Sequence, residues 1–160
     1  MAKLTISVVI PAHNRHEILK RVLEHLAQGS HRPDEVFIVD DGSTPPIAEA
    51  LDLQAIGLSG LQVIRHDKSR GAAAARNAGA RAATGDIILF VDDDVFPDTH
   101  CLRYHIQIHT EHPEPEYGIM GRLNFDPDLP RTPVMHYLEE SGGFTIVAKG
   151  TEGEVQRRGL

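Results

Sequence analysis

Runs of apolar residues alternate with amphipathic stretches along the first part of the chain. The run from Ile6 to Ile10 is β-branched and stops at Pro11, which is typical of a buried strand. Asn14, with Glu17 three residues later, resembles a helix N-cap and its capping box. The sequence therefore predicts a strand followed closely by a helix. The apolar positions that recur at helical spacing are Ile18, Leu19, Val22, Leu23 and Leu26.

The same alternation continues as far as residue 91. Further strands are predicted at Val36 to Val39, Leu61 to Ile64 and Ile87 to Val91. A weak helix is predicted near Ile47 to Ile56, and an alanine-rich helix from Ala72 to Ala83. The small alanine side chains indicate a helix that packs closely on a sheet.

This order of elements predicts an α/β fold. Strands that are joined through helices pair in parallel, and the crossovers place helices on both faces of the sheet. The unbroken apolar runs Val8 to Ile10 and Ile87 to Val91 fit central strands that are buried on both sides. We therefore expect a Rossmann-like domain with a mostly parallel central sheet.

The size and charge of the chain narrow its function. A length of 160 residues with 41% hydrophobic residues suffices for one domain with a substantial core, and not comfortably for two. The formal net charge of −7 argues against a nucleic-acid partner, which would require a basic face. The 16 lysines and arginines still allow a local pocket for an anion.

Neither export nor membrane insertion is expected from the sequence. Cys101 is the only cysteine, which excludes an internal disulfide and fits a reducing compartment. No apolar run approaches the roughly 18 residues of a membrane span, and the N-terminus lacks the apolar region of a signal peptide. We expect a cytoplasmic protein, and association with a membrane surface stays open.

Every predicted strand ends in a cluster of polar residues. In open α/β sheets, ligands bind outside the carboxyl ends of the strands, so these clusters would share one rim. Four clusters on one rim indicate a binding site more strongly than any one motif. They are residues 11–15, Asp40 to Ser43, His66 to Gly71, and Asp92 to Asp94.

The last of these clusters is acidic. Asp92, Asp93 and Asp94 directly follow an apolar run, where ionised carboxylates repel one another, and a divalent cation with oxygen ligands would relieve the repulsion. In an extended chain, Asp92 and Asp94 would face one way and Asp93 the other. A solvated acidic turn explains these three residues alone equally well.

A basic helix start is predicted on the same rim. Gly71 can adopt a positive φ angle and turn the chain into the helix from Ala72, whose first N–H groups favour negative charge. Arg76 can bind phosphate oxygens there, and an ion pair with an aspartate of the rim is the alternative. Lys68 and Arg70 are explained as well by solvated loop charges. A cation site beside an anion site suits a diphosphate bridged by a metal ion, as in a nucleotide or a nucleotide-activated substrate.

Common nucleotide-binding motifs are missing from the sequence. There is no G-x-G-x-x-G after the first strand and no G-x-x-x-x-G-K-[ST], which disfavours a dinucleotide-binding Rossmann domain and a P-loop protein. A nucleotidyltransferase would carry a glycine- and arginine-rich loop after the first strand, and His13 to Arg15 does not supply one.

Four blocks of the sequence carry a family resemblance. They are Val8 to Arg15, Val39 to Ser43, Gly71 to Gly79 and Phe90 to Asp94. In this order and at these distances, the blocks resemble the family two glycosyltransferases over about residues 4 to 125. The resemblance implies an A-type glycosyltransferase fold and transfer of a sugar from a nucleoside diphosphate donor, with inversion at the anomeric carbon.

The resemblance also implies how the nucleobase is bound. It places Pro11, Ala12 and His13 at the base, with His13 standing where the family often has a stacking tyrosine. Asp41 would accept the N–H of a uracil-like base, so a UDP-sugar is favoured as the donor. The acceptor, whether a carbohydrate, a lipid-linked molecule or a protein, stays open.

The charged residues receive roles from the same resemblance. Arg76 would bind the diphosphate, while Asp92 and Asp93 would lie near the ribose. Asp94 would hold Mg²⁺ or Mn²⁺, and the metal would act as a Lewis acid that offsets the charge on the leaving diphosphate.

Several of these residues also fit simpler roles. His13 and Arg15 fit exposed loop positions, and Asn14 fits a helix cap. Asp41 fits the turn that precedes Gly42. Only their places in the four blocks single them out.

A general base for the acceptor hydroxyl is harder to identify. The family usually carries it on an acidic pair well downstream of the aspartate cluster. The only acidic doublet downstream of Asp94 is Glu139-Glu140, so Glu140 is the candidate. The chain ends 66 residues after Asp94, because 160 minus 94 is 66.

The sequence therefore predicts two parts with different tasks. Residues 1–125 would bind the nucleotide sugar, and residues 126–160 would form an abbreviated acceptor-side segment and an irregular tail. Two functions remain: a metal-dependent glycosyltransferase, or a donor-binding module or fragment that binds a sugar nucleotide without efficient transfer. Formation of a homodimer is one way in which the acceptor site would be completed.

Overall fold

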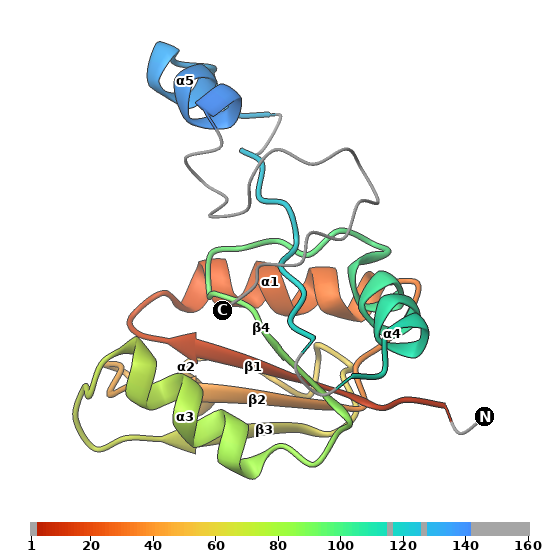
Figure 1. The fold of residues 1–160 in the computed structure, drawn as a ribbon. Helices are drawn as coiled ribbons and strands as arrows, with labels where there is room; N and C mark the ends of the chain where they lie inside the picture. The colour runs from red at the N-terminus through yellow and green to blue at the C-terminus, as the bar shows by residue number, and fades with distance from the viewer. Residues whose placement is uncertain (1–2, 115–116, 126–127, 142–160) are drawn as a thin grey trace. The chain divides into compact units, whose positions relative to one another are not determined.

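Four parallel strands form the sheet of the N-terminal part of the chain (Figure 1). In the computed structural model, which describes residues 3–114, 117–125 and 128–141, the spatial order of the strands is β3-β2-β1-β4. Every pairing is parallel, and Val8 lies opposite both Val36 and Leu89. The predicted Rossmann-like α/β fold with a parallel sheet is confirmed. The strands are β1 (Ile6–Ala12), β2 (Glu35–Asp40), β3 (Leu61–Arg65) and β4 (Ile87–Phe90).

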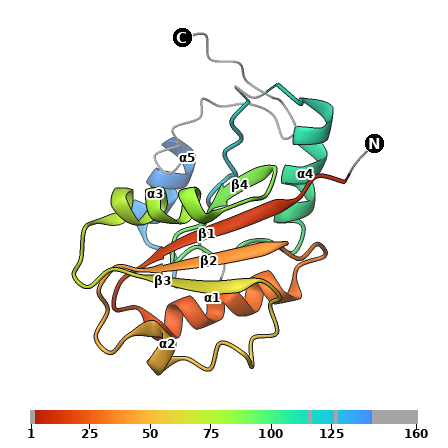
Figure 2. The same ribbon diagram turned by 90° about the horizontal axis from the view of Figure 1, so that it is seen from below.

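Helices cover both faces of this sheet, as predicted (Figure 2). Because side chains alternate along a strand, Val8 and Ile10 of β1 point to the face that is covered by α1 (His16–Gln28). Val9 points to the opposite face, which is covered by α3 (Ala72–Ala82). The residues between Val8 and Ile10 are fully buried, so the prediction of a central β1 is confirmed.

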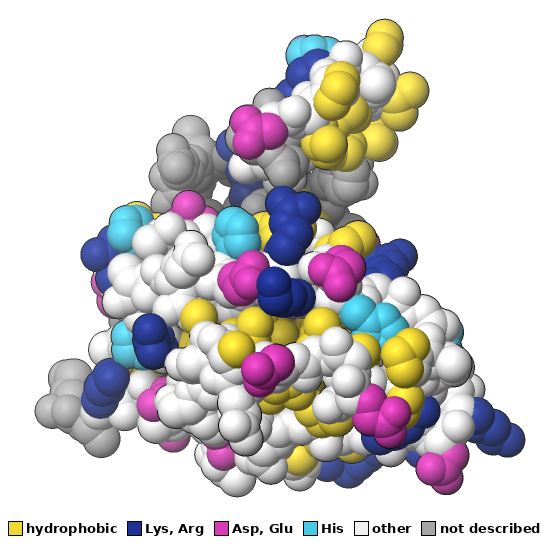
Figure 3. Space-filling model, turned by 180° about the vertical axis from the view of Figure 1, so that it is seen from behind, with side chains coloured by type: hydrophobic (Ala, Val, Ile, Leu, Met, Phe, Trp, Pro, Cys, Tyr) yellow, Lys and Arg dark blue, Asp and Glu magenta, His cyan; other side chains and the backbone are white. Residues whose placement is uncertain are grey.

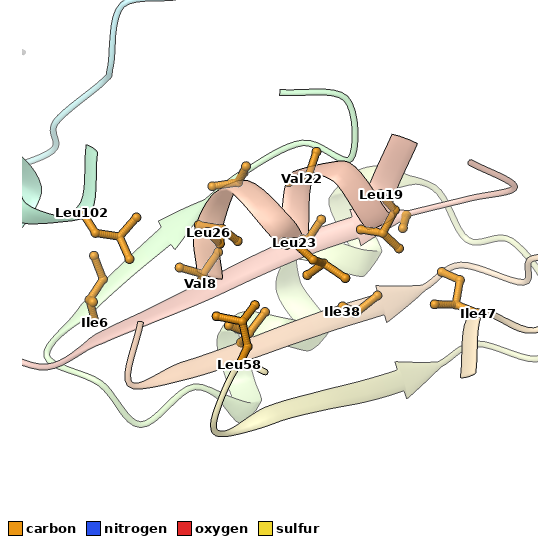
Figure 4. Packing of buried hydrophobic residues seen from close by; sticks show 14 of the residues in the cluster. Ile6, Val8, Leu19, Val22, Leu23, Leu26, Ile38, Ile47, Leu58 and Leu102 are labelled. Atoms are coloured by element: carbon orange, nitrogen blue, oxygen red, sulfur yellow. The ribbon is translucent and has the colours of Figure 1, made fainter. Parts of the chain in front are cut away.

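The larger core lies between α1 and the sheet (Figure 4). One stripe of α1 supplies most of its helical side chains, while the neighbouring Ile18 is 39% exposed. Ile47 of α2 (Ile47–Ala50) and Leu102 of α4 (Cys101–Glu111) complete this core. The buried side chains of α1 are Leu19, Val22, Leu23 and Leu26.

The smaller core explains the alanine-rich sequence of α3. Ala75 is fully buried against the sheet, in the same cluster as Val9, Phe37 and Val39. A Cβ atom at Gly79 would collide with the side chain of Val9. The helix therefore lies as close to the sheet as its small residues allow, as predicted.

The strand predicted at Ile87 to Val91 does not have the expected burial. In the described part of the chain, β4 pairs with β1 alone and lies at the edge of the sheet. Ile88 and Phe90 are 39% and 46% exposed, because α3 packs on β1 and β2 rather than on β4. The prediction that this strand is central and buried on both sides is wrong for the described residues.

Two local predictions are also corrected. Asn14 does not cap α1: the N-cap residue is Arg15, without a side-chain cap, and Asn14 has a φ angle of 56°. The Oδ1 atom of Asn14 instead accepts a hydrogen bond from Thr44 N at 2.8 Å. The helix predicted near Ile47 to Ile56 ends at Ala50, because Leu51 turns to an extended conformation and is buried in the larger core.

A second unit begins after residue 117. The chain divides into the compact units Met1–Tyr117 and Gly118–Leu160, and the second contains α5 (Pro133–Ser141). The expected boundary at residue 125, and the tasks of the two parts, stay predictions. Within the described stretches, no helix has the length and hydrophobicity needed to span a bilayer.

Candidate functional site

Hydrogen bonds connect the polar loops at the carboxyl ends of the strands. His13 Nδ1 lies 2.8 Å from the carbonyl oxygen of Asp41, which joins the loop after β1 to the loop after β2. Asn14 N donates to Ser43 Oγ at 3.0 Å and adds a second link between these loops. The backbone N–H of His13 also lies 3.4 Å from Oδ2 of Asp93, beyond β4. The loop after β1 thus contacts two of the other three clusters that the sequence placed on one rim.

The three predicted nucleobase residues differ in their exposure. Pro11 and Ala12 are buried at the end of β1, where they lie opposite Val39 and Asp40. Ala12 O accepts a hydrogen bond from Asp41 N at 2.9 Å. His13 is exposed, so its ring is the one side chain of the three that a ligand can reach.

Asp41 organises the loop between β3 and α3. Its carboxylate accepts hydrogen bonds from Ser69 Oγ at 2.7 Å and from the backbone N–H of Arg70 and Gly71 at 2.9 and 2.8 Å. His66 Nδ1 lies 2.7 Å from its Oδ1. Burial alone would raise the pKa of Asp41, but these hydrogen bonds outweigh burial and hold its pKa below the ordinary range. The prediction that Asp41 also accepts a nucleobase N–H stays a prediction.

Asp40 and Arg65 form a second, deeper group that the sequence analysis did not single out. The fully buried Asp40 accepts hydrogen bonds from Ser43 N at 2.8 Å and Ile47 N at 3.1 Å, and it forms an ion pair with Arg65. Arg65 also donates to the carbonyl oxygen of Ser43 at 3.1 Å. The only sequence signal was a charged residue at the end of an apolar strand. This group fixes the turn that presents Asp41.

Gly71 begins α3 in the way that the sequence predicts. Its φ angle is 87°, and it is the N-cap residue of the helix. Its backbone N–H is taken by Asp41, so this donor is committed within the protein. The remaining N–H groups of the first turn favour negative charge beside the helix.

Two arginines hold the three aspartates of the rim. Arg15 Nη1 donates to Oδ2 of Asp94 at 2.6 Å and to Oδ1 of Asp93 at 3.1 Å. Arg76, on α3, forms an ion pair with Asp92. The alternative role weighed for Arg76, an ion pair with an aspartate of the rim, is therefore present in the structure. Contact with a diphosphate stays a prediction.

The aspartates differ in their surroundings. The side chains of Asp92 and Asp94 are 51% and 48% exposed, whereas that of Asp93 is 11% exposed. Burial raises the pKa of Asp93, against the opposing effects of the His13 N–H and Arg15. Asp92 and Asp94 are consequently the two more accessible carboxylates of the three.

Asp94 fits the requirements of a hard divalent cation. Its accessible oxygen atoms are the ligands that Mg²⁺ and Mn²⁺ prefer. No group of three or more His, Cys, Asp or Glu side chains in the described residues could hold a metal by itself. Magnesium is often bound by one or two carboxylates together with substrate phosphates, so one aspartate suits a metal that arrives with a diphosphate.

An open, basic cavity of about 400 Å³ lies beside the rim, at the end of β3. The cavity lies next to the residues that hydrogen-bond to Asp41, so Lys68 and Arg70 belong to the polar rim. The cavity is lined by Arg65, His66, Asp67, Lys68 and Arg70.

The candidate general base lies in the other unit. Glu140 is on α5 and its side chain is exposed. Its role as the general base stays a prediction.

The fold and the rim define an open α/β domain, a class of fold in which ligands bind outside the carboxyl ends of the parallel strands. A profile of glycosyl transferase family 2 matches residues 7–142. The chain belongs to this family, and the predicted family resemblance is confirmed.

Relatives extend this result over most of the chain. Validoxylamine A glucosyltransferase from Streptomyces hygroscopicus subsp. limoneus is 33% identical over 138 residues, which are 84% of this chain and 30% of that protein. The chain thus spans only about 30% of the length of curated relatives such as this one.

Solved structures show the same fold. The mannosyltransferase PcManGT from Pyrobaculum calidifontis, in complex with GDP-Man and Mn²⁺, matches with a TM-score of 0.64 and 23% identity, over 78% of this chain and 36% of that chain. TarS from S. aureus, in complex with UDP-GlcNAc, matches with a TM-score of 0.60 and 23% identity, over 77% of this chain and 39% of that chain.

Proposed function

We propose that this chain is a glycosyltransferase that transfers a sugar from a nucleoside diphosphate donor to an acceptor, with inversion and with the assistance of a metal ion. The observation that carries the proposal is the meeting of the four strand-end clusters at one rim, where His13, Asp41 and Asp93 are joined by hydrogen bonds. Membership of glycosyl transferase family 2 supports it. The relative named as a glucosyltransferase supports the same class of reaction.

The nucleobase binds at the loops after β1 and β2 in this proposal. The exposed ring of His13 stacks on the base, above the buried Pro11 and Ala12. The Asp41 carboxylate accepts a hydrogen bond from the N–H of a uracil-like base. Otherwise Asp41, through its hydrogen bonds to Arg70 N and Gly71 N, positions the backbone that binds the base. A UDP-sugar is the favoured donor, and the complex of TarS with UDP-GlcNAc supports this choice.

The diphosphate and the ribose bind between α3 and the aspartates. Arg76 leaves Asp92 to bind the diphosphate, while Asp92 and Asp93 face the ribose. Asp94 holds Mg²⁺ or Mn²⁺, which, when bound, offsets the negative charge that develops on the leaving diphosphate. The complex of PcManGT with GDP-Man and Mn²⁺ supports the metal.

Proton removal from the acceptor hydroxyl requires a carboxylate, and Glu140 is our candidate for this base. The alternative function is a donor-binding module without efficient transfer. The alternative depends on the base, because Glu139-Glu140 is the only acidic doublet downstream of Asp94 in the sequence.

Calorimetry with UDP, in the presence and absence of Mn²⁺, tests donor binding. We expect UDP binding to strengthen with Mn²⁺, and we expect Asp94→Ala to remove this gain, since it removes the metal ligand. The matched control is Asp52→Ala, an exposed aspartate of another loop, which should keep the gain. If UDP binds equally well without metal and after Asp94→Ala, the metal assignment is wrong.

A turnover assay separates the enzyme from the binding module. We would screen a panel of nucleotide sugars for binding and then measure hydrolysis and transfer with the donor that binds. Transfer that Glu140→Gln abolishes, with donor affinity unchanged, supports the enzyme and its base. Normal binding with no turnover on any acceptor supports the module.

A further inference from the structure

Arg15 joins the loop after β1 to the acidic loop after β4. Its Nη1 atom lies 2.6 Å from Oδ2 of Asp94 and 3.1 Å from Oδ1 of Asp93. The backbone of Arg15 is anchored at the start of α1, where its carbonyl oxygen accepts a hydrogen bond from Leu19 N at 2.9 Å. The guanidinium therefore contacts the same carboxylate that we assign to the metal.

The two cations compete for that carboxylate. A guanidinium at hydrogen-bond distance from Asp94 and a divalent cation on the same oxygen repel each other strongly at such separations. Arg15 also has a second acceptor, because Asp93 stays within its reach and is much less exposed than Asp94. Arg15 can release Asp94 and still keep its ion pair with Asp93. Replacement of the guanidinium by a metal ion at Asp94 therefore requires the movement of only one side chain.

We propose that Arg15 is a built-in competitor of the divalent cation: it neutralises Asp94 until the metal arrives with the donor diphosphate, and then it pairs with Asp93 alone. The proposal rests on the proposed function, because it takes the metal and the donor from there. Metal binding to the protein is then weakened, because the metal must displace the guanidinium from Asp94.

Mn²⁺ binding measured by electron paramagnetic resonance tests this role without any turnover. The titration uses the full chain, with and without UDP, and compares the original protein with Arg15→Gln. We expect Arg15→Gln to bind Mn²⁺ alone about fivefold more tightly, the gain that follows from losing an exposed ion pair of about 1 kcal/mol.

Two further variants make the test specific. Arg21→Gln removes the same charge from the exposed face of α1, where Arg21 lies over the ring of Phe96, and it should leave Mn²⁺ binding nearly unchanged. Adding Asp94→Asn to Arg15→Gln should abolish the gain. Equal tightening in Arg21→Gln, or unchanged or weaker binding in Arg15→Gln, overturns the proposal.

Folding and the proposed function are checked separately. Circular dichroism and thermal melting establish that the variants fold. If Arg15→Gln does not fold, Arg15→Lys replaces it in the titration. One ammonium group binds both aspartates less well than a guanidinium, so Arg15→Lys should also bind Mn²⁺ more tightly than the original protein, though by less than fivefold. Unchanged or weaker Mn²⁺ binding in Arg15→Lys would contradict the proposal. Calorimetry with UDP reports on donor binding. If UDP does not bind, the proposed function fails, but the Mn²⁺ titrations without UDP still test the competition between Arg15 and the metal at Asp94. Absence of Mn²⁺ binding in every protein, with UDP present, overturns the competitor role.

Discussion

Gly42 allows the loops after β2 and β3 to approach each other at the rim. Its φ angle is 78°, and a Cβ atom there would lie 2.7 Å from Ser69 N and 2.9 Å from the carbonyl carbon of Lys68. We expect Gly42→Ala to lower the free energy of unfolding by about 2–4 kcal/mol, from backbone strain and from a collision with backbone atoms that have little room to move. Urea unfolding followed by circular dichroism measures the loss.

A second glycine separates the two causes. Gly57 has a φ angle of 71°, yet a Cβ atom there would meet nothing within 4 Å. Gly57→Ala should therefore cost only the backbone strain of about 1–2 kcal/mol. Equal losses in the two variants would show that the close approach at Gly42 contributes nothing.

Glu35 should make the free energy of unfolding depend on pH in the acidic range. Hydrogen bonds from Ser7 and Thr84 lower its pKa from 4.5 to about 2, and so they join the starts of β1 and β2 to the turn before β4. Because the folded pKa lies below the unfolded one, the stabilisation is complete above pH 4.5 and is lost as the pH falls towards 2.

The variant Glu35→Gln tests this linkage. It should be about 1–2 kcal/mol less stable at pH 7, because charge-assisted hydrogen bonds are lost, and its stability should change less between pH 4.5 and 2. Urea unfolding at a series of pH values measures both effects. The exposed Glu49→Gln is the control, and an equal flattening of its pH profile would contradict the assignment to Glu35.

At the level of elements, the contact between α3 and the sheet depends on one missing side chain. In most helices, glycine to alanine stabilises by about 1 kcal/mol. Here the new methyl group would collide with Val9 and lie 3.2 Å from Cγ2 of Val39, so we expect Gly79→Ala to destabilise by about 1–3 kcal/mol. Thermal and urea unfolding show whether Gly79→Ala raises or lowers the free energy of unfolding. Ala73→Gly, at an exposed position of α3, reports helix propensity alone, and a stabilised Gly79→Ala would contradict the tight packing.

The elements that the sequence predicted well are those that local pattern determines. β2, β3 and α3 lie within one residue or so of their predicted bounds, because apolar runs and alanine spacing are properties of each segment. Asn14 was mispredicted because its partner, Thr44, is 30 residues away and outcompetes a local cap. The exposure of β4 depends on which elements cover it, and no segment of the chain carries that information by itself.

The site shows the same division. The strand-end position of every cluster followed from the order of elements, since parallel strands end on one side of a sheet. The pairing inside the rim did not follow, because Arg15 lies 78 and 79 residues from Asp93 and Asp94. The commitment of Asp41 to Ser69, Arg70 and Gly71 was hidden for the same reason.

At the scale of the molecule, charge is mixed rather than concentrated on the face that Figure 3 shows. Acidic and basic side chains are interspersed on the face seen in Figure 3, which accords with a net charge of −7 that includes 16 basic residues. The anionic donor that we propose would therefore meet an acidic protein with a few local cations, chiefly Arg76 and the basic cavity at the end of β3. A divalent cation that accompanies the diphosphate would reduce the repulsion, which gives the proposed metal a second role in binding.

The division of the chain at residue 117 makes a prediction about the whole protein. Both hydrophobic cores and every residue that we assign to the donor lie in Met1–Tyr117, whereas Glu140 lies in Gly118–Leu160. A chain shortened after Tyr117 should melt cooperatively and bind UDP within about twofold of the full chain, because compact units with their own core fold independently. It should lose any transfer activity.

Thermal melting by circular dichroism and calorimetry with UDP measure these outcomes, and Asp94→Ala in the shortened chain should again remove the effect of Mn²⁺. Loss of the cooperative transition would contradict the independence of the first unit. Retained transfer would instead exclude Glu140 as the base and require a carboxylate within the first 117 residues.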